Sequence, residues 1–326
     1  MATLVTGSSG FVCVNVARTL ATLGEPVVAF DLTPPDDRVR AFLAPADDHV
    51  TFVTGDVCDG SLVERTIAER GVDAVIHGAV ITATTPEVES ANPGRTASVN
   101  LGGTIAVLEA ARKANVRRFV YVSSGSVYGV QGSLEQPLDE TTTPRPAGLY
   151  GITKLAAEQT VIRWNALHGL DTAAVRLSSP YGPMERPTHA RVAPSLVYAW
   201  ATAAVRGERP VLPHLEGFRD WTYVDDTAAG IVAAWRAERL TSRVFNIGVG
   251  TSYTAPDLLK AIQAVIPSFE VGVSPDRGLL PGIWGRDNRG TLDVSLAHRE
   301  LGFDPQCDLT AGIARYVEWL KASTEY

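Results

Sequence analysis

The first 30 residues hold the feature that most restricts the fold: two short apolar runs separated by a glycine-rich turn and a longer helical segment. Leu4–Thr6 and Val27–Phe30 are predicted to be strands, and Phe11–Leu23 is predicted to be a helix. Gly7 and Gly10 lie in the turn between the first strand and the helix. A crossover helix joins parallel strands, whereas antiparallel strands can be joined by a tight hairpin. The chain therefore begins as a β-α-β unit.

The same alternation of strands and helices continues to about residue 177. The predicted strands are nearly continuous apolar runs, such as the segment that starts at Phe119 and reads FVYV, which is typical of strands buried on both faces. The predicted fold class is α/β, a doubly wound parallel sheet with helices on both faces. The other predicted strands here are Val50–Val53, Asp73–His77, Arg118–Ser123 and Thr172–Leu177, and the other predicted helices run from about Ser61 to Arg70, Thr96 to Ala114 and Tyr150 to Leu167.

After Ser178 the pattern changes, because Pro and Arg become denser and the strands become short and isolated. Val244–Ile247 is predicted to be one more core strand, and Thr254–Val265 and Asp308–Leu320 are predicted to be helices. We therefore predict a sheet domain of residues 1–177 plus about 220–250, and a smaller α/β lobe of about 178–219 and 251–326.

A stretch rich in Pro and Thr, Glu135–Pro146, leaves two interpretations open. It is either a flexible loop over a site or an ordinary surface connection.

Composition excludes several classes of function. Lys and Arg number 29 against 36 Asp and Glu, giving a net charge of −7, and no block of like charge stands out. Such a chain is expected to bind neither nucleic acid nor a membrane surface. No targeting segment is visible, and the three widely spaced cysteines suggest a reducing compartment without a metal site, so we expect a cytoplasmic protein acting on a small molecule.

The glycine-rich turn predicts a phosphate-binding site. Gly7 permits a tight turn, and Gly10 allows backbone N–H groups to approach a pyrophosphate at the helix N-terminus. Asp31 ends the second strand, where a carboxylate binds ribose hydroxyls and repels a 2′-phosphate, which favours NAD over NADP. Asp56 follows the third strand and either reaches the adenine or caps the next helix.

A second motif predicts proton transfer. Tyr150 and Lys154 are four residues apart on a predicted helix and therefore share one face. A nearby ammonium favours the phenolate form of a tyrosine, so Tyr150 is suited to exchange a proton with a substrate hydroxyl. Ser124 stands at the carboxyl end of a predicted strand, where ligands bind in open α/β sheets. Taken alone, the pair also fits a surface Tyr beside a solvated Lys, and the serine fits an ordinary turn.

Together these residues resemble the extended short-chain dehydrogenase/reductase superfamily, in its NAD-dependent epimerase/dehydratase branch. The segment from Thr6 to Phe11 resembles the family's TGGAGF, Ser123–Gly129 resembles SSxxVYG, and Tyr150–Lys154 resembles YxxSK. Arg176–Pro183 resembles RxxNxYGP, and further matches run along nearly the whole chain. The resemblance implies a Rossmann domain, a C-terminal substrate lobe and a homodimer built from the helices around Thr96–Ala114 and Tyr150–Leu167.

The resemblance also implies roles for individual residues. It implies a catalytic set of Ser124, Tyr150 and Lys154, with Ser126 facing the substrate. It implies that NAD is contacted by Gly7, Gly10, Phe11, Val12, Asp31, Leu32, Asp56, Val57, Ala79, Tyr150, Lys154 and Leu177.

For the substrate, the resemblance points to an anionic, nucleotide-linked sugar. Ser179 takes the place of an Asn that contacts the sugar nucleotide in relatives, and its hydroxyl has a shorter reach. The stretch Tyr181–Pro187 looks most like the YGPxxRP of uridine-diphosphate-glucuronate 4-epimerases, which assigns Arg186 to the substrate.

Two further arginines are expected at the substrate. Arg219 matches an arginine that meets the diphosphate in relatives, and its alternative is a surface pair with Asp220. Arg286 is expected to supply the last substrate contact, with Arg289 as the alternative, although the spacing departs from the family's pattern.

Three hypotheses follow. The first is a nucleotide-diphosphate sugar epimerase, or a related dehydratase or decarboxylase, that oxidises its substrate transiently to a keto-sugar on tightly held NAD. Its most similar relatives would be UDP-glucose or UDP-glucuronate 4-epimerases. The second is an NAD-dependent dehydrogenase of a free sugar, uronate or small hydroxy compound, which Ser179 and the irregular last arginine favour. The third is a non-catalytic NAD-binding sensor or scaffold, which the intact Ser124, Tyr150 and Lys154 disfavour.

Overall fold

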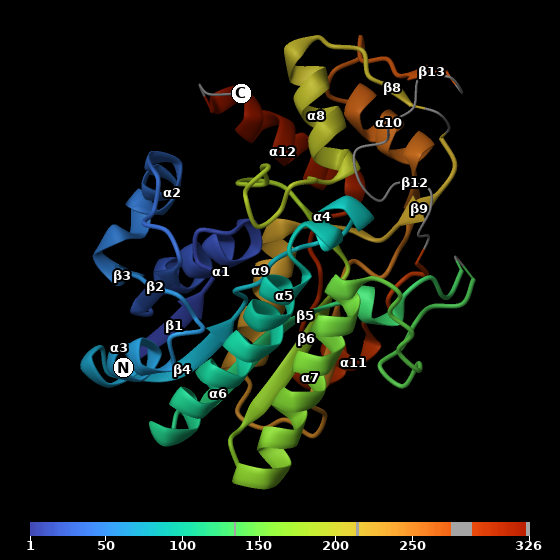
Figure 1. Ribbon diagram of the computed structural model, residues 1–326. Helices are drawn as coiled ribbons and strands as arrows, with labels where there is room; N and C mark the ends of the chain where they lie inside the picture. Colours follow the sequence, from blue (N-terminus) through green and yellow to red (C-terminus); the bar gives the residue numbers. More distant parts are fainter. Residues whose placement is uncertain (134, 213–214, 275–288, 324–326) are drawn as a thin grey trace.

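The computed structural model describes residues 1–133, 135–212, 215–274 and 289–323. Its centre is a seven-stranded parallel sheet with the order β11-β6-β5-β4-β1-β2-β3, so the chain starts inside the sheet and extends it in both directions (Figure 1). The predicted α/β, doubly wound Rossmann fold is confirmed. The strands are β1 (Ala2–Thr6), β2 (Val27–Asp31), β3 (Val50–Thr54), β4 (Val72–His77), β5 (Arg118–Ser124), β6 (Thr172–Leu177) and β11 (Val244–Ile247).

Both faces of the sheet are covered by helices. Val5 of β1 packs in one apolar cluster with α1 and α9, whereas its neighbour Leu4 packs in another with α3, α6 and α7. Alternate residues of a strand point to opposite faces, so burial of both faces explains why the strands are continuous apolar runs. The covering helices are α1 (Phe11–Thr22) and α9 (Val224–Arg236) on one face, and α3 (Gly60–Glu69), α6 (Thr104–Lys113) and α7 (Leu149–His168) on the other.

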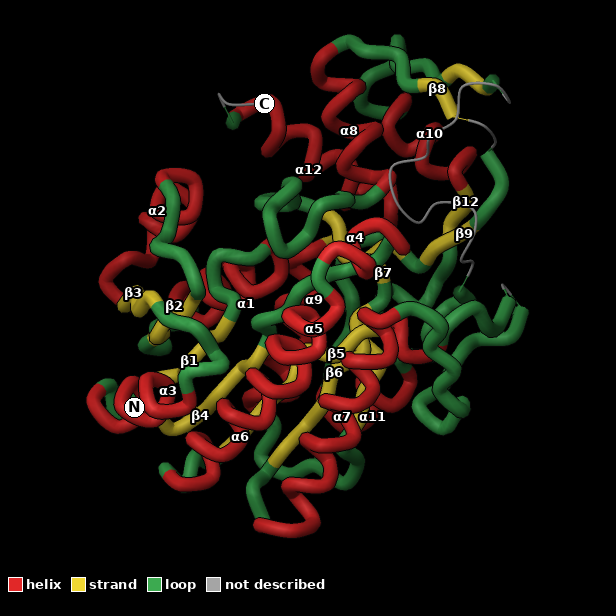
Figure 2. Tube along the Cα trace, in the orientation of Figure 1, coloured by secondary structure: helices red, strands yellow, loops and turns green. Residues whose placement is uncertain are grey.

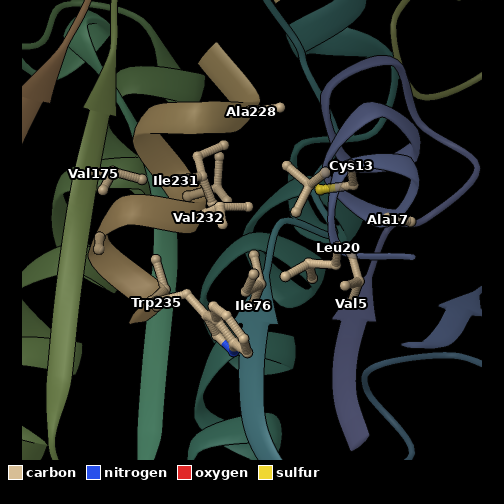
Figure 3. Packing of buried hydrophobic residues seen from close by; sticks show 14 of the residues in the cluster. Val5, Cys13, Ala17, Leu20, Ile76, Val175, Ala228, Ile231, Val232 and Trp235 are labelled. Atoms are coloured by element: carbon tan, nitrogen blue, oxygen red, sulfur yellow. The ribbon is translucent and has the colours of Figure 1, made fainter. Parts of the chain in front are cut away.

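Helix α9 was absent from the sequence prediction, yet it is central to one core. Figure 3 shows Ile231 and Trp235 of α9 in one cluster with Ile76 of β4 and with Cys13, Ala17 and Leu20 of α1. Gly230 lies against β11, and a Cβ atom there would stand 2.5 Å from Cγ2 of Ile247. Glycine lowers helix propensity, but here it is needed for the close approach of helix and strand.

The single helix predicted for Thr96–Ala114 is interrupted. It consists of α5 (Pro93–Ala97), a wider π-type turn η2 (Ser98–Gly103) and α6. Asn100 in this turn accepts a hydrogen bond from the backbone of Ile81 at 2.8 Å and donates one to Thr153 of α7 at 3.0 Å. The irregular turn therefore links the loop after β4 to the helix that carries Tyr150.

A third apolar cluster lies beyond the sheet, where α8, α10 and α12 pack around Trp200 (Figures 1 and 2). The proposed limits of the two domains stay a prediction. The elements here are β7 (Ser179–Tyr181), α8 (Leu196–Arg206), β8 (Val211–Leu212), β9 (Phe218–Arg219), β10 (Trp221–Tyr223), β12 (Tyr253–Thr254), α10 (Ala255–Gln263), β13 (Gly272–Val273) and α12 (Leu309–Ala322).

The remaining elements are short. Within the described ranges no helix is long and apolar enough to cross a membrane, and no cluster of three or more potential metal ligands occurs. These elements are α2 (Asp37–Leu43), η1 (Ala44–His49), α4 (Pro86–Ala91), η3 (Gly125–Tyr128) and α11 (Ser295–Leu301).

Candidate active site

A cleft of about 850 Å³ opens at the carboxyl ends of the parallel strands. This is where ligands bind in open α/β sheets. All the predicted site residues that the structure describes line it: Gly7, Gly10, Phe11, Val12, Asp31, Leu32, Asp56, Val57, Ala79, Ser124, Ser126, Tyr150, Lys154, Leu177, Ser179, Arg186 and Arg219. The predicted Arg286 lies outside the described residues.

The glycine-rich turn forms a tight cradle at one end of the cleft. Gly7 has a φ of 70°, and a Cβ atom there would stand 2.8 Å from Cα of Ala79, so only glycine fits. Gly10 caps α1 without a side-chain hydrogen bond, which leaves the first N–H groups of the helix facing the cleft. Oδ2 of Asp31 accepts a hydrogen bond from the backbone N of Ser9 at 2.9 Å, which fixes the carboxylate beside this turn.

Asp56 is not a helix cap, because the cap of α3 is Asp59. Asp56 instead accepts a hydrogen bond from the backbone of Cys58 and forms an ion pair with Arg95 of α5 at 2.7 Å. Burial alone would raise the pKa of Asp56, but the hydrogen bonds from Cys58 and Arg95 lower it below its ordinary value. Asp56 is therefore charged and already paired at this edge of the cleft.

Tyr150 and Lys154 come together on α7, one helical turn apart. Nζ of Lys154 is buried, donates a hydrogen bond to the carbonyl of Val122 at 2.6 Å and lies 6.0 Å from the ring centre of Tyr150. Burial lowers the pKa of Lys154 to about 8. Loss of water around the phenol raises the pKa of Tyr150, while a hydrogen bond with Ser124 and the charges of nearby arginines oppose this rise.

Helix α7 closely approaches the turn after β5, formed by Ser124 and η3 and called the serine turn below. A Cβ atom at Gly151 would stand 2.7 Å from the carbonyl oxygen of Ser126, so glycine beside Tyr150 is required. In the turn, Oγ of Ser124 and Oγ of Ser126 are hydrogen bonded at 3.1 Å. The phenol and both hydroxyls therefore line one part of the cleft, as the motifs predict.

The predicted substrate arginines occupy different places. Arg186 forms an ion pair with Asp36 at 2.7 Å, on the side of the cleft where β2 ends. Arg219 is on β9 at the wall formed by the short strands. Arg289, the alternative to Arg286, lies against Gly125 in the serine turn. A Cβ atom added at Gly125 would stand 3.0 Å from Cζ and Nε of the Arg289 guanidinium.

The model of the NAD dependent epimerase/dehydratase family matches residues 3–248. The chain belongs to this family. It is 31% identical to a dTDP-glucose 4,6-dehydratase from Streptomyces niveus, covering 98% of this chain and 93% of that protein. It is 30% identical to a UDP-glucose 4-epimerase from Mycolicibacterium smegmatis, covering 100% of both chains.

Solved structures agree with this membership. A UDP-glucose 4-epimerase from Thermotoga maritima, solved with UDP-glucose, matches with a TM-score of 0.85 and 26% identity over 99% of both chains. A UDP-glucose 4-epimerase from Thermus thermophilus, solved as a complex with NAD, matches with a TM-score of 0.83 and 25% identity, covering 99% of this chain and 100% of that chain. The protein is thus an enzyme of the NAD-dependent epimerase/dehydratase family, and NAD is its cofactor.

The cleft fits NAD on structural grounds. The cradle at Gly7 has no room for a side chain, the first turn of α1 lacks a side-chain cap, and Asp31 is fixed where a ribose of the dinucleotide would lie. The individual contacts to NAD stay predictions.

Replacing Asp31 by alanine is expected to weaken NAD binding about ten- to hundredfold, because charge-assisted hydrogen bonds to the ribose are lost. NADP binding is expected to strengthen relative to NAD, because the carboxylate no longer repels the 2′-phosphate. Dissociation constants for both nucleotides, measured on cofactor-free protein, test this. Asp37→Ala, at an exposed position on α2, is the matched control. A wild-type preference for NADP would contradict the assignment.

Sequence reasoning missed a buried network behind the serine turn. Glu158 of α7 is fully buried and accepts hydrogen bonds from Arg176 of β6 at 2.6 Å and from Oγ of Ser123 at 2.7 Å. Arg176 also donates to the phenol oxygen of Tyr128 at 2.8 Å, and Tyr128 bonds in turn to Asn246 of β11. This network braces the strand end that carries Ser124.

The same network anchors the stretch Glu135–Pro146. The hydroxyl of Tyr128 donates to the carbonyl of Asp139 at 2.9 Å, and Oε1 of Glu140 accepts from the backbone N of Asn246 at 2.7 Å. The segment is therefore held to the sheet between its ends, and the residues that follow it, Ala147 and Gly148, line the cleft.

Sequence reasoning also missed Glu185 and Arg191. Both lie in the loop after β7, which has no periodic pattern to indicate which of its charged residues are buried. Arg191 lines the cleft beside Phe11, and Glu185 stands behind it with no exposed surface.

Proposed function

We propose that this enzyme is an epimerase of a nucleotide-diphosphate sugar that inverts C4 by transient oxidation to a keto-sugar and retains its NAD. The observation that carries the proposal is that Ser124, Tyr150 and Lys154 share one cleft with several arginines. Guanidinium groups suit a diphosphate because their planar fork binds two oxygens at once. Arg219 and Arg289 are the arginines that we assign to the diphosphate.

The chain's own residues would carry the proton transfers. Tyr150 takes the proton of the sugar hydroxyl and later returns it, and Ser124 holds the same oxygen through its hydroxyl. The buried ammonium of Lys154 favours the phenolate form of Tyr150. Bound NAD supplies the acceptor for a hydride and returns it.

The cleft supports epimerisation over dehydration. Elimination of water needs a further acid and base beside the departing hydroxyl. In the described part of the chain, no carboxylate that lines the cleft belongs to the serine turn or to α7. The carboxylates that do line it are engaged elsewhere: Asp31 with Ser9, Asp36 with Arg186, Asp56 with Arg95, and Glu89 with the backbone N of Leu149.

The homodimer expected from the resemblance belongs to this proposal. Two large apolar side chains of α7, Ile152 and Leu167, are 47% and 53% exposed. Exposed apolar residues on a helix that lies beside α6 suit a helical interface between two copies.

The state of the cofactor tests the proposal. Freshly purified, desalted protein is denatured with acid, and the released nucleotide is quantified. An epimerase that recycles NAD is expected to release close to one NAD(H) per chain and to convert its sugar nucleotide with no NAD added. An empty site, with NADH accumulating only when NAD and a free sugar are supplied, would instead support the dehydrogenase hypothesis that Ser179 favours.

A further inference from the structure

The loop after β7 contains a buried carboxylate whose oxygens are fully used within the protein. Glu185 has no exposed surface. Its Oε1 accepts hydrogen bonds from Nη2 of Arg191 and from the backbone N of Ser195, both at 2.8 Å, and its Oε2 accepts one from Oγ of Ser195 at 2.9 Å. A buried carboxylate is costly unless it is paired, and the ion pair with Arg191 together with the bonds from Ser195 supplies this pairing.

What Glu185 holds in place is the guanidinium of Arg191. Cζ of Arg191 lies 5.6 Å from the ring centre of Phe11, directly after the glycine-rich turn, and 27% of the side chain is exposed. Its loop is fixed by a backbone bond to Thr188 and by a bond from the backbone N of Thr82 to the carbonyl of Ala190 at 2.7 Å. Nε of Arg191 is buried and has no hydrogen-bond partner among the described residues. The guanidinium is therefore preorganised, with donor capacity that the protein does not use.

Arg191 and Arg289 both line the cleft that contains the Tyr150 phenol. Arg289 lies against Gly125 in the serine turn, and both guanidinium groups lower the pKa of the Tyr150 phenol, against the larger effect of lost hydration, which raises it. Arg191 lines the same cleft as Ser124 and Tyr150. With Arg219 and Arg289 assigned to the diphosphate, Arg191 is left for a further anionic group of the substrate.

We propose that Arg191, held by buried Glu185, binds a carboxylate on the sugar ring, so that the enzyme selects a nucleotide-linked uronate over the corresponding neutral sugar. This inference rests on the proposed function and names its substrate class. A carboxylate matches the planar fork of a guanidinium. A neutral sugar leaves the fixed cation without its partner, and such unpaired polar groups are what reject the wrong substrate.

The test measures binding to protein that cannot turn over. In Tyr150→Phe protein loaded with NAD, affinities for UDP-glucuronate and UDP-glucose are measured by calorimetry. The uronate is expected to bind about 30-fold more tightly, as one charge-assisted contact allows. Adding Arg191→Gln is expected to reduce this preference to less than about threefold. Arg209→Gln is the matched control, because Arg209 forms a surface pair with Glu270 in which both side chains are 65% exposed.

Two further variants keep the result decisive if Arg191→Gln folds poorly. Arg191→Lys retains the charge and is expected to retain part of the preference, because a lysine lacks the fork. Glu185→Gln keeps the shape of the anchor, removes its charge and is expected to weaken uronate binding selectively.

The outcomes separate this inference from the proposed function. Equal affinity for both sugars in the parent protein, with C4 epimerisation of either by the wild type, overturns the uronate assignment and leaves the epimerase intact. Loss of NAD affinity in Arg191→Gln, with the sugar preference unchanged, shows instead that Arg191 binds a phosphate of the cofactor. Failure of both nucleotide sugars to bind overturns the proposed function itself.

Discussion

Tyr150→Phe is expected to reduce kcat about 10²- to 10⁴-fold, the range typical for loss of a general acid–base group. The substitution removes one hydroxyl from a ring that lies 6.0 Å from Nζ of Lys154. Under the proposed function, this phenol is the group that takes the proton of the sugar hydroxyl, and phenylalanine cannot replace it. Steady-state rates on the nucleotide sugar, measured with NAD bound, give the result.

The matched control for this prediction is Tyr198→Phe on α8, which loses the same hydroxyl outside the cleft. NAD content and melting temperature of both variants should equal those of the wild type. Activity of Tyr150→Phe within about threefold of wild type would show that the phenol does not transfer the proton.

Glu158→Ala is expected to destabilise the protein by about 3–5 kcal/mol, the usual consequence of removing one partner of a buried ion pair. Glu158 is 0% exposed and Arg176 is 3% exposed, so the substitution leaves a buried guanidinium uncompensated and also removes the acceptor of Ser123. Chemical denaturation of wild type and variant, compared at equal NAD content, measures the loss.

Glu64→Ala is the control, because its pair with Lys113 is 40% and 53% exposed and is expected to contribute less than about 1 kcal/mol. Replacing both Glu158 and Arg176 by methionine is expected to recover much of the stability, since no buried charge then remains. A loss for Glu158→Ala no larger than for Glu64→Ala would show that the network does not brace this part of the core.

The parts of the fold that the sequence predicts well are those set by local chemistry. The runs that end at Thr6 and His77 are strands because every residue in them is apolar or pairs its polar atoms internally, as His77 does with Thr6 and Thr104. Helix α9 was missed because Gly230 lowers its helix propensity, and the reason for this glycine, contact with Ile247, is visible only in three dimensions.

In the candidate site too, local spacing predicts some of the contacts, and others depend on the three-dimensional fold. Tyr150 and Lys154 could be paired from sequence because a spacing of four residues fixes their relation on a helix. The pairs of Arg176 with Glu158 and of Arg191 with Glu185 could not be found, because the first joins two elements and the second lies inside an aperiodic loop. Arg186, which the resemblance assigns to the substrate, lines the cleft and forms an ion pair with Asp36, and its contact with the substrate stays a prediction.

In the proposed function, a hydride leaves C4 of a nucleotide sugar and returns to the same carbon. The most direct measurement uses UDP-glucose and UDP-glucuronate, each deuterated at C4, with no NAD added, and follows the products by NMR and mass spectrometry. We predict the C4 epimer of one of them, with deuterium retained at C4 and no net NADH. A product that has lost water, or oxidised sugar formed together with free NADH, would contradict the account.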